Sequence, residues 1–263
     1  MFMSELAATV RLAVMTASRR ALLVENRIAV LKGRDITTEA DLAAQEAVRN
    51  FVKKCYPGDT VLSEEDYPSF LDDTCEVPPG RVWVVDPVDG TVNYSRGLPY
   101  WCSSVAVLED GRAIAGAVYS PVLEELFEAA ESQPRLNGEP IGPSRTGPLA
   151  DALVEVALLP NCGEETKNAM LAVVSKLLSL TRGVRVTMSG ALSLCYLASG
   201  RLDAYLCPVG GFFSHSAAGL IAESAGCVLT DFSGNAYAPG KSRSLLAAAT
   251  PELHEAIRKL LWA

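Results

Sequence analysis

The stretch RVWVVDPVDGTVNYSRG, residues 81–97, runs from an apolar segment directly into two carboxylates, Asp86 and Asp89. The apolar residues predict a buried strand, and Gly90 and Thr91 after the second carboxylate indicate a turn that leads into a helix. An ionised carboxylate is costly to remove from water, so such a pair usually meets solvent, a cation or strong hydrogen-bond donors. Which of these it meets determines what the site can do.

The turn after Asp89 and the two carboxylates together favour a bound cation. A strand that enters a helix exposes free backbone N–H groups, and these donors, with the helix dipole, favour an anion such as phosphate. Carboxylates beside a phosphate would repel it unless a divalent cation lay between them, so the combination indicates Mg²⁺ that also takes substrate oxygens as ligands. The simpler alternative is that Asp89–Gly90 is only a turn and Asp86 only a cap, because such turns are common.

The composition is that of an ordinary globular chain. Of its 263 residues, 49% are hydrophobic and 21% are charged, and the net charge of -8 argues against binding to a nucleic-acid backbone. No segment approaches the roughly 18 apolar residues of a membrane helix, and Glu5 and Arg11 interrupt the N-terminal apolar stripe, so a secretory signal is not expected. The seven cysteines include no C-x-x-C pair, which predicts a reduced, cytoplasmic protein.

The pattern along the chain predicts two halves, residues 1–147 and 148–263, with a turn-rich boundary at 135–148. In the first half we expect an opening helix that ends near Gly33, a second helix up to Cys55 and then a meander of strands. In the second half strands and helices alternate, which implies a layered α/β arrangement. Thr250 with Pro251 supplies a cap and a first-turn proline for a terminal helix.

Three segments together resemble a known family. WVVDPVDGTVNY (83–94) resembles the signature D-P-[LI]-D-G-T-x-N-[FY] of the inositol monophosphatase-like, Mg²⁺-dependent, lithium-sensitive phosphatases. KGRDITTEAD (32–41) resembles the lysine, aspartate and T-x-x-D pattern upstream in that family, and LSEED (62–66) resembles its G-E-E. The resemblance covers nearly the whole chain. It implies an α/β fold, a layered α-β-α-β-α sandwich of the inositol monophosphatase/fructose-bisphosphatase type, commonly found as a homodimer.

The resemblance implies metal ligands at the matching positions. Glu64, Asp86 and the backbone carbonyl of Val88 would hold one Mg²⁺, and Asp86 would bridge to a second Mg²⁺ that Asp89 also binds. Such a pair of ions is a two-metal clamp, in which one ion lowers the pKa of a water and the other stabilises the leaving oxygen.

The resemblance also implies catalytic and phosphate-binding roles. Thr91, hydrogen-bonded to Asp41, would orient the attacking water, and Glu64 would help to hold that water. The N–H groups of Gly90 and Thr91 would bind phosphate oxygens.

The second signature of the family, roughly W-D-x-A-A-G-x-x-[IV]-x-E-E-A-G-G near the C-terminus, is altered here to FSHSAAGLIAESAGC (213–227). Ser214 stands where the family has an aspartate that ligates the second metal, and a neutral hydroxyl is a much poorer Mg²⁺ ligand than a carboxylate. The second metal could be recruited only with substrate phosphate, His215 could lend a nitrogen, or catalysis could be lost; we favour the first. Ser214 is also a good N-cap for a helix.

The substrate side of the pattern differs as well. Met188 and Gly190, on either side of Ser189, replace the outer residues of the family's G-S-A, and Cys207 stands where inositol-specific members have an acidic residue. We expect Ser189, Cys207 and Ser214 to contact substrate. These changes argue against myo-inositol phosphate as the best substrate.

The sequence thus predicts a phosphatase that hydrolyses a small phosphomonoester, a polyol, sugar or nucleoside phosphate, by Mg²⁺-activated water. One alternative is a 3′-phosphonucleotide or sugar-bisphosphate phosphatase. The other is a catalytically degenerate member of the family that binds a ligand or a protein. The substrate is the expected partner, and neither nucleic acid nor membrane is expected to bind.

Overall fold

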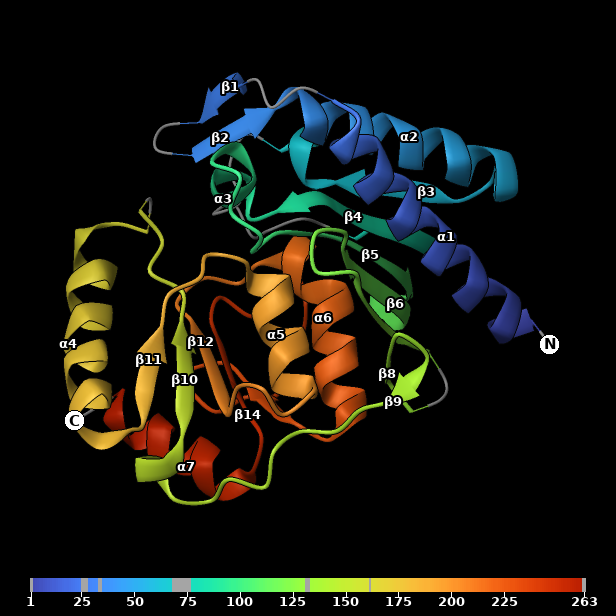
Figure 1. The fold of residues 1–263 in the computed structure, drawn as a ribbon. Coiled ribbons are helices and arrows are strands. Elements are labelled where there is room, and N and C mark those ends of the chain that lie inside the picture. The colour runs from blue at the N-terminus through green and yellow to red at the C-terminus, as the bar shows by residue number, and fades with distance from the viewer. Residues whose placement is uncertain are drawn as a thin grey trace.

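The chain forms two β-sheets with helices above, between and below them, as Figure 1 shows. The computed structural model describes residues 2–24, 28–32, 35–67, 77–130, 133–160 and 162–261. No helix in these ranges is long and apolar enough to cross a membrane.

The first sheet has seven strands, which are hydrogen-bonded in chain order. They are β3 (Thr60–Ser63), β4 (Arg81–Asp89), β5 (Cys102–Glu109), β6 (Arg112–Ser120), β7 (Glu125–Ala129), β8 (Arg135–Leu136) and β9 (Glu139–Pro140). Strands β4 to β9 are antiparallel neighbours, which confirms the predicted meander, and β3 adds in parallel to β4.

Both faces of this sheet are covered by helices, which explains the nearly continuous apolar run of β4. Trp83 and Val85 face the cluster formed with α1 (Phe2–Leu22) and α2 (Glu39–Cys55). Val82 and Val84 face the opposite cluster, formed with α5 (Gly190–Ala198) and α6 (Phe212–Ala225). Helix α6 crosses β6 so closely that a Cβ at Gly116 would lie 2.9 Å from Ala217 Cα.

The second sheet lies on the other side of α5 and α6. Its order is β11 (Gly183–Arg185), β10 (Leu153–Val156), β12 (Ala204–Cys207), β14 (Leu245–Ala248) and β13 (Val228–Thr230). The first three strands run parallel. The outer face of the sheet packs on α4 (Glu164–Leu180) and α7 (Pro251–Leu260).

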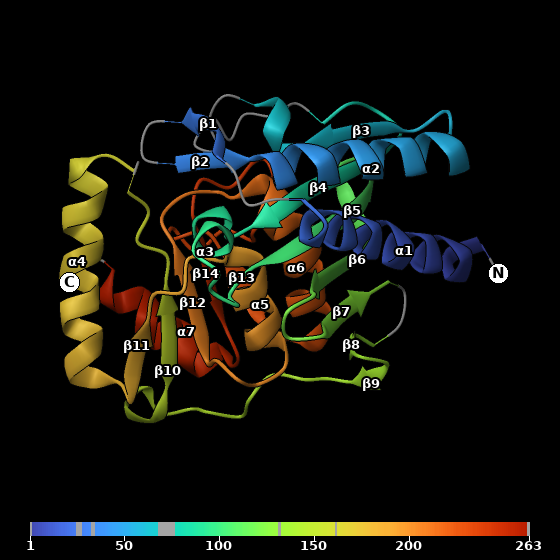
Figure 2. The same ribbon diagram turned by 45° about the horizontal axis from the view of Figure 1, so that its top comes forward.

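The layers therefore alternate as α1 and α2, seven strands, α5 and α6, five strands, α4 and α7 (Figures 1 and 2). This order confirms the predicted α-β-α-β-α sandwich. The chain passes from one sheet to the other between Pro140 and Leu153, near the predicted boundary, but the division into domains 1–147 and 148–263 stays a prediction.

Local predictions near the N-terminus were partly wrong. The opening helix ends at Leu22, and a hairpin of β1 (Ile28–Lys32) and β2 (Asp35–Thr38) follows; Gly33, where we expected the helix to end, lies outside the described residues. The apolar run before Gly33 is short and contains β-branched residues, which suit a strand as well as a helix.

Helix boundaries in the second half were predicted more closely. The terminal helix begins as expected, with the Thr250 hydroxyl accepting from Leu253 N–H. Helix α6, however, begins at Phe212, and its N-cap is Gly211 in the left-handed conformation. Ser214 is therefore inside the first turn of the helix, and the prediction that it caps the helix was wrong.

Candidate active site

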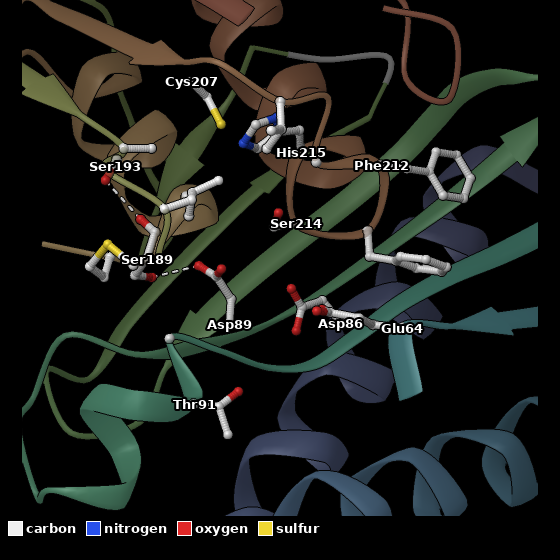
Figure 3. A pocket seen from close by; sticks show the side chains of 18 of the residues that line it. Glu64, Asp86, Asp89, Thr91, Ser189, Ser193, Cys207, Phe212, Ser214 and His215 are labelled. Atoms are coloured by element: carbon white, nitrogen blue, oxygen red, sulfur yellow. Dashed lines mark hydrogen bonds between the residues drawn. The ribbon is translucent and has the colours of Figure 1, made fainter. Parts of the chain in front are cut away.

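Strand β4 carries both motif carboxylates into one pocket. It continues past Asp86 to Asp89, with a register shift against β5 between them. After Asp89, Gly90 takes a left-handed conformation and leads into the short helix α3 (Thr91–Ser95). In Figure 3 the side chains of Asp86 and Asp89 lie close together with Glu64 beside Asp86.

Asp86 is a buried carboxylate that lies beside the negative charges of neighbouring carboxylates. It is 2% solvent-exposed, and its Oδ1 has no hydrogen-bond partner among the described residues. Burial raises the pKa of Asp86 well above its ordinary value, and the negative charges of Glu64 and Asp89 raise it further. A buried carboxylate oxygen without a donor, beside two further carboxylates, is a site that a cation would stabilise.

Asp89 is held by the other half of the chain. Its Oδ2 accepts from Ser189 Oγ at 2.5 Å and from Ala191 N at 2.9 Å, and Cys102 Sγ lies 3.7 Å away. Burial raises the pKa of Asp89, while the hydrogen bonds from Ser189 and Ala191 lower it. The N-terminus of α5 thereby fixes the carboxylate of β4 in place.

Thr91 connects the pocket to a buried carboxylate behind it. Its hydroxyl lies 3.2 Å from Asp41 Oδ1 and 2.9 Å from the Val88 carbonyl oxygen. Asp41 also accepts from the Thr38 N–H at 2.8 Å, as part of the capping box of α2. Burial, with a smaller effect of Glu65, raises the pKa of Asp41 to about 7. The hydrogen bond between Thr91 and Asp41 that the resemblance implied is thus present.

The remaining predicted residues gather around the same pocket, whose empty volume is about 880 Å³ including the space open to solvent. All predicted site residues except Asp41 line it: Glu64, Asp86, Val88, Asp89, Gly90, Thr91, Ser189, Cys207 and Ser214. Among the described residues that line it there is no lysine or arginine. An anionic ligand would meet only carboxylates here unless cations came with it.

The carboxylates do not form a complete metal cage by themselves. Within the described ranges, no three Asp, Glu, His or Cys side chains are grouped closely enough to hold a metal ion. Asp89 Oδ2 is engaged by Ser189, and Ser214 offers a hydroxyl where the family pattern has a carboxylate. Mg²⁺ commonly binds through one or two carboxylates, waters and substrate phosphate, so the donor set fits this mode.

His215 is not available as a metal ligand. Its Nδ1 lies 2.7 Å from the Gly210 carbonyl oxygen, and its Nε2 lies 3.2 Å from the Tyr205 hydroxyl. The side chain is buried, and this desolvation lowers its pKa to about 4. Both ring nitrogens are therefore occupied, which removes the explanation that His215 replaces the missing aspartate.

Two glycines make room for that imidazole. A Cβ at Gly211 would lie 2.6 Å from His215 Cε1, and a Cβ at Gly190 would lie 3.0 Å from His215 Nε2. Gly190 is one of the positions where the chain departs from the family's G-S-A. This departure, Gly211 and His215 are therefore parts of one packing arrangement.

Sequence reasoning missed the pocket residues Glu155, Ser193 and Tyr205. Glu155 is 2% exposed and its pKa is raised by burial. One signal was available: it is a carboxylate within the short apolar run ALVEVAL, residues 152–158. Glu155 belongs to none of the motifs recognised in the sequence.

A model of the inositol monophosphatase family matches residues 2–263. The chain belongs to the inositol monophosphatase family.

The family assignment identifies the chain as a phosphomonoesterase of a family that generally uses Mg²⁺. It is 33% identical over 241 residues to inositol monophosphatase 1 of Solanum lycopersicum, covering 90% of this chain and 86% of the relative. It is 30% identical over 243 residues to the Nus factor SuhB of Escherichia coli (strain K12), covering 86% of each. The structure of an IMPase from Thermotoga maritima aligns with a TM-score of 0.83 at 25% identity, covering 95% of this chain and 94% of that one.

Proposed function

We propose that this inositol monophosphatase family member hydrolyses a small phosphomonoester, a polyol, sugar or nucleoside phosphate, with Mg²⁺. The observation that carries the proposal is the buried Oδ1 of Asp86, which has no hydrogen-bond partner among the described residues. It lies in a pocket lined by further carboxylates and, in the described lining, by no basic residue. Such a pocket is repulsive to a phosphoryl group until divalent cations are bound.

Glu64, Asp86 and the Val88 carbonyl would hold one Mg²⁺, and Asp86 and Asp89 would hold a second. When bound, Mg²⁺ supplies a lowered pKa for a coordinated water and neutralisation of charge on the phosphoryl group. Val88 O already accepts from the Thr91 hydroxyl, but a carbonyl oxygen has a second lone pair. Asp89 Oδ2 is similarly occupied by Ser189, which leaves Oδ1 to face the pocket.

The chain's own residues would orient the water and the phosphate. Thr91 donates to Val88 O or Asp41 Oδ1, so its hydroxyl oxygen can accept a hydrogen bond from a water and align it. Asp41, with a pKa of about 7, can take up a proton near neutral pH. The N–H groups of Gly90 and Thr91, at the start of α3, would bind phosphate oxygens.

The second metal position would be weaker than the first. Ser214 lines the pocket but offers no charge, and a hydroxyl adds little to Mg²⁺ affinity. We propose that this position fills only together with the phosphate of the substrate.

The experiment is phosphate release from a panel of polyol, sugar and nucleoside phosphates, with Mg²⁺ and with EDTA. The expected result is turnover of at least one ester that requires Mg²⁺. A Ser214→Asp variant is assayed beside the wild type. No turnover by the wild type at high Mg²⁺, together with an active Ser214→Asp variant, would overturn the proposal in favour of a degenerate enzyme.

The similarity to proteins named Nus factor SuhB keeps a protein-binding role as the second candidate. A specificity for 3′-phosphonucleotides or sugar bisphosphates would appear as a preference within the ester panel. A homodimer and a cytoplasmic location remain predictions.

A further inference from the structure

Glu155 occupies a position in the second sheet that ordinarily holds an apolar side chain. Along β10, Val154 and Val156 face the outer cluster with α4 and α7. Glu155 alternates with them and lies directly across from Tyr205 of β12, on the face that lines the pocket. A carboxylate on an inward face, 2% exposed, is costly to retain without a partner.

The protein provides partners for only one of its two oxygens. Oε1 accepts from Thr187 N at 2.6 Å and from Thr187 Oγ1 at 2.9 Å, whereas no described residue donates to Oε2. The positive charge of Arg185 lowers the pKa of Glu155, but Arg185 is exposed and does not line the pocket. Burial raises the pKa of Glu155, and the two bonds from Thr187 lower it.

The segment that holds Glu155 also holds the motif carboxylate. Thr187 Oγ1 lies 3.4 Å from Ser193 Oγ, which donates to the Ser189 carbonyl oxygen at 2.7 Å. Ser189 Oγ in turn donates to Asp89 Oδ2. Glu155 and Asp89 line the same pocket and are thus linked through residues 187–193; Figure 3 shows Ser193, Ser189 and Asp89 in this chain of contacts.

We propose that Glu155 Oε2 binds hydrogen-bond donors, hydroxyl or ammonium groups, on the organic part of the substrate. This inference rests on the proposed function, in which the phosphate lies against Asp86 and Asp89. A hydroxyl or ammonium group of the substrate would then donate to Oε2, to which no described residue donates.

The Glu155→Gln variant separates this role from a structural one. The two donors of Thr187 will hold the amide oxygen in place of Oε1, so the NH₂ group takes the position of Oε2. This change keeps the size and the internal hydrogen bonds but turns the acceptor in the pocket into a donor. Glu139→Gln, an exposed position on β9, is the matched control.

The experiment measures KM and kcat for three esters in Mg²⁺: glycerol 2-phosphate with hydroxyls, phosphoethanolamine with an ammonium, and phenyl phosphate with neither. In Glu155→Gln we expect KM to rise about 10- to 100-fold for the ester whose donors Glu155 binds, and to change less than about twofold for phenyl phosphate. The larger of the two increases identifies a hydroxyl or an ammonium as the ligand group. Glu139→Gln should change none of the three.

Two results overturn the inference while the proposed function stands: equal losses for all three esters, or no change in any of them. If no ester is turned over by the wild type, the proposed function fails. The same comparison then uses dissociation constants measured by calorimetry in Mg²⁺. The inference is overturned separately if the donor-bearing esters bind the wild type no tighter than phenyl phosphate does. It is also overturned if they bind Glu155→Gln as tightly as they bind the wild type.

Discussion

The pocket has two walls that differ in how closely their sequences match the family pattern. The wall built by β4 and α3 keeps the family motif, with Asp86, Asp89 and Thr91 in place. The wall built by α5, β12 and α6 departs from it at Met188, Gly190, Cys207 and Ser214. The first wall concentrates negative charge, and the second carries a buried, hydrogen-bonded His215 and small residues around it.

Under the proposed function, the contrast would mean that the chemistry is kept while recognition of the organic group differs. Groups that activate water must meet the strict geometry of phosphoryl transfer, which leaves few alternatives. Residues that contact the rest of the substrate can be replaced together, because a new side chain requires only that its neighbours leave room for it. Gly190 and Gly211, which accommodate His215, are such a set. The following predictions test this division, beginning with the largest effect.

Asp86→Asn should remove most activity and still stabilise the metal-free protein. We expect kcat/KM in Mg²⁺ to fall by at least about 10³-fold, because the amide is a poor Mg²⁺ ligand. Without metal, the free energy of unfolding should rise by about 1–3 kcal/mol, since the neutral amide ends repulsion with Glu64 and Asp89. Phosphate release and urea unfolding in EDTA measure the two effects.

The control for this variant is Asp110→Asn, at an exposed left-handed turn position between β5 and β6. It should leave both quantities unchanged. Wild-type activity in Asp86→Asn would show that the motif carboxylates do not form the active site.

Ser214→Asp should restore a charged ligand to the second wall. We expect the Mg²⁺ concentration for half-maximal activity to fall about 10- to 100-fold, because a carboxylate replaces a neutral hydroxyl. Calorimetric Mg²⁺ titration without substrate provides a readout independent of turnover. Ser214→Ala is the control, and it should resemble the wild type; an equal loss in both variants would mean that Ser214 acts through packing alone.

The first wall was predicted from the sequence because its residues are close together in the chain and their spacing is specific. Asp86, Asp89 and Thr91 lie within six residues of one another, and the pattern of strand, turn and helix start leaves little freedom in their placement. The layered fold followed from the alternation of strands and helices in the second half and from the family resemblance.

The second wall was only partly predictable, because its parts meet through tertiary packing. Nothing in the local sequence shows that Gly190 and Gly211 lie against the same imidazole, or that Glu155 shares a pocket with Asp89. Ser214 lines the pocket, but the prediction that it caps a helix was wrong because α6 begins at Phe212, after the left-handed Gly211. The β1–β2 hairpin was missed because its apolar run is too short to separate strand from helix.

Two buried groups, Asp41 behind the first wall and His215 in the second, should make the stability of the metal-free protein respond to pH in opposite directions. The pKa of Asp41 is about 7 in the folded state against 3.8 for an ordinary aspartate, so the folded state binds the extra proton. This contribution to stability is complete below pH 4 and is lost as the pH rises to about 7. The pKa of His215 is about 4 against 6.5, so its contribution is complete above pH 6.5 and is lost as the pH falls to about 4.

Each slope amounts to at most about 1.4 kcal/mol per pH unit, and variants separate them. Urea unfolding in EDTA between pH 4 and 7.5 should show Asp41→Asn gaining stability relative to the wild type as the pH rises. His215→Gln should gain relative to the wild type as the pH falls. Glu252→Gln, at an exposed position of α7, should track the wild type throughout; parallel curves for all four proteins would contradict the assignment.

Met188→Gly tests the smallest difference between the walls. Met188 lies in the pocket with φ 62, where a non-glycine residue is strained, and the family pattern has glycine there. Glycine relieves that strain but gives the unfolded chain more freedom, so we expect a net gain of about 0.5–1 kcal/mol in unfolding free energy.

Asp110→Gly is the matched control for Met188→Gly, because Asp110 also has a positive φ, 49, but lies in an exposed turn. It should change stability by a similar amount and leave KM unchanged. Met188→Gly should change KM by up to about threefold as well, since the methionine side chain contributes apolar surface to the pocket. A clear loss of stability in Met188→Gly would mean that packing of the thioether outweighs the backbone strain. The methionine would then be retained for the stability of the second wall, independently of the substrate.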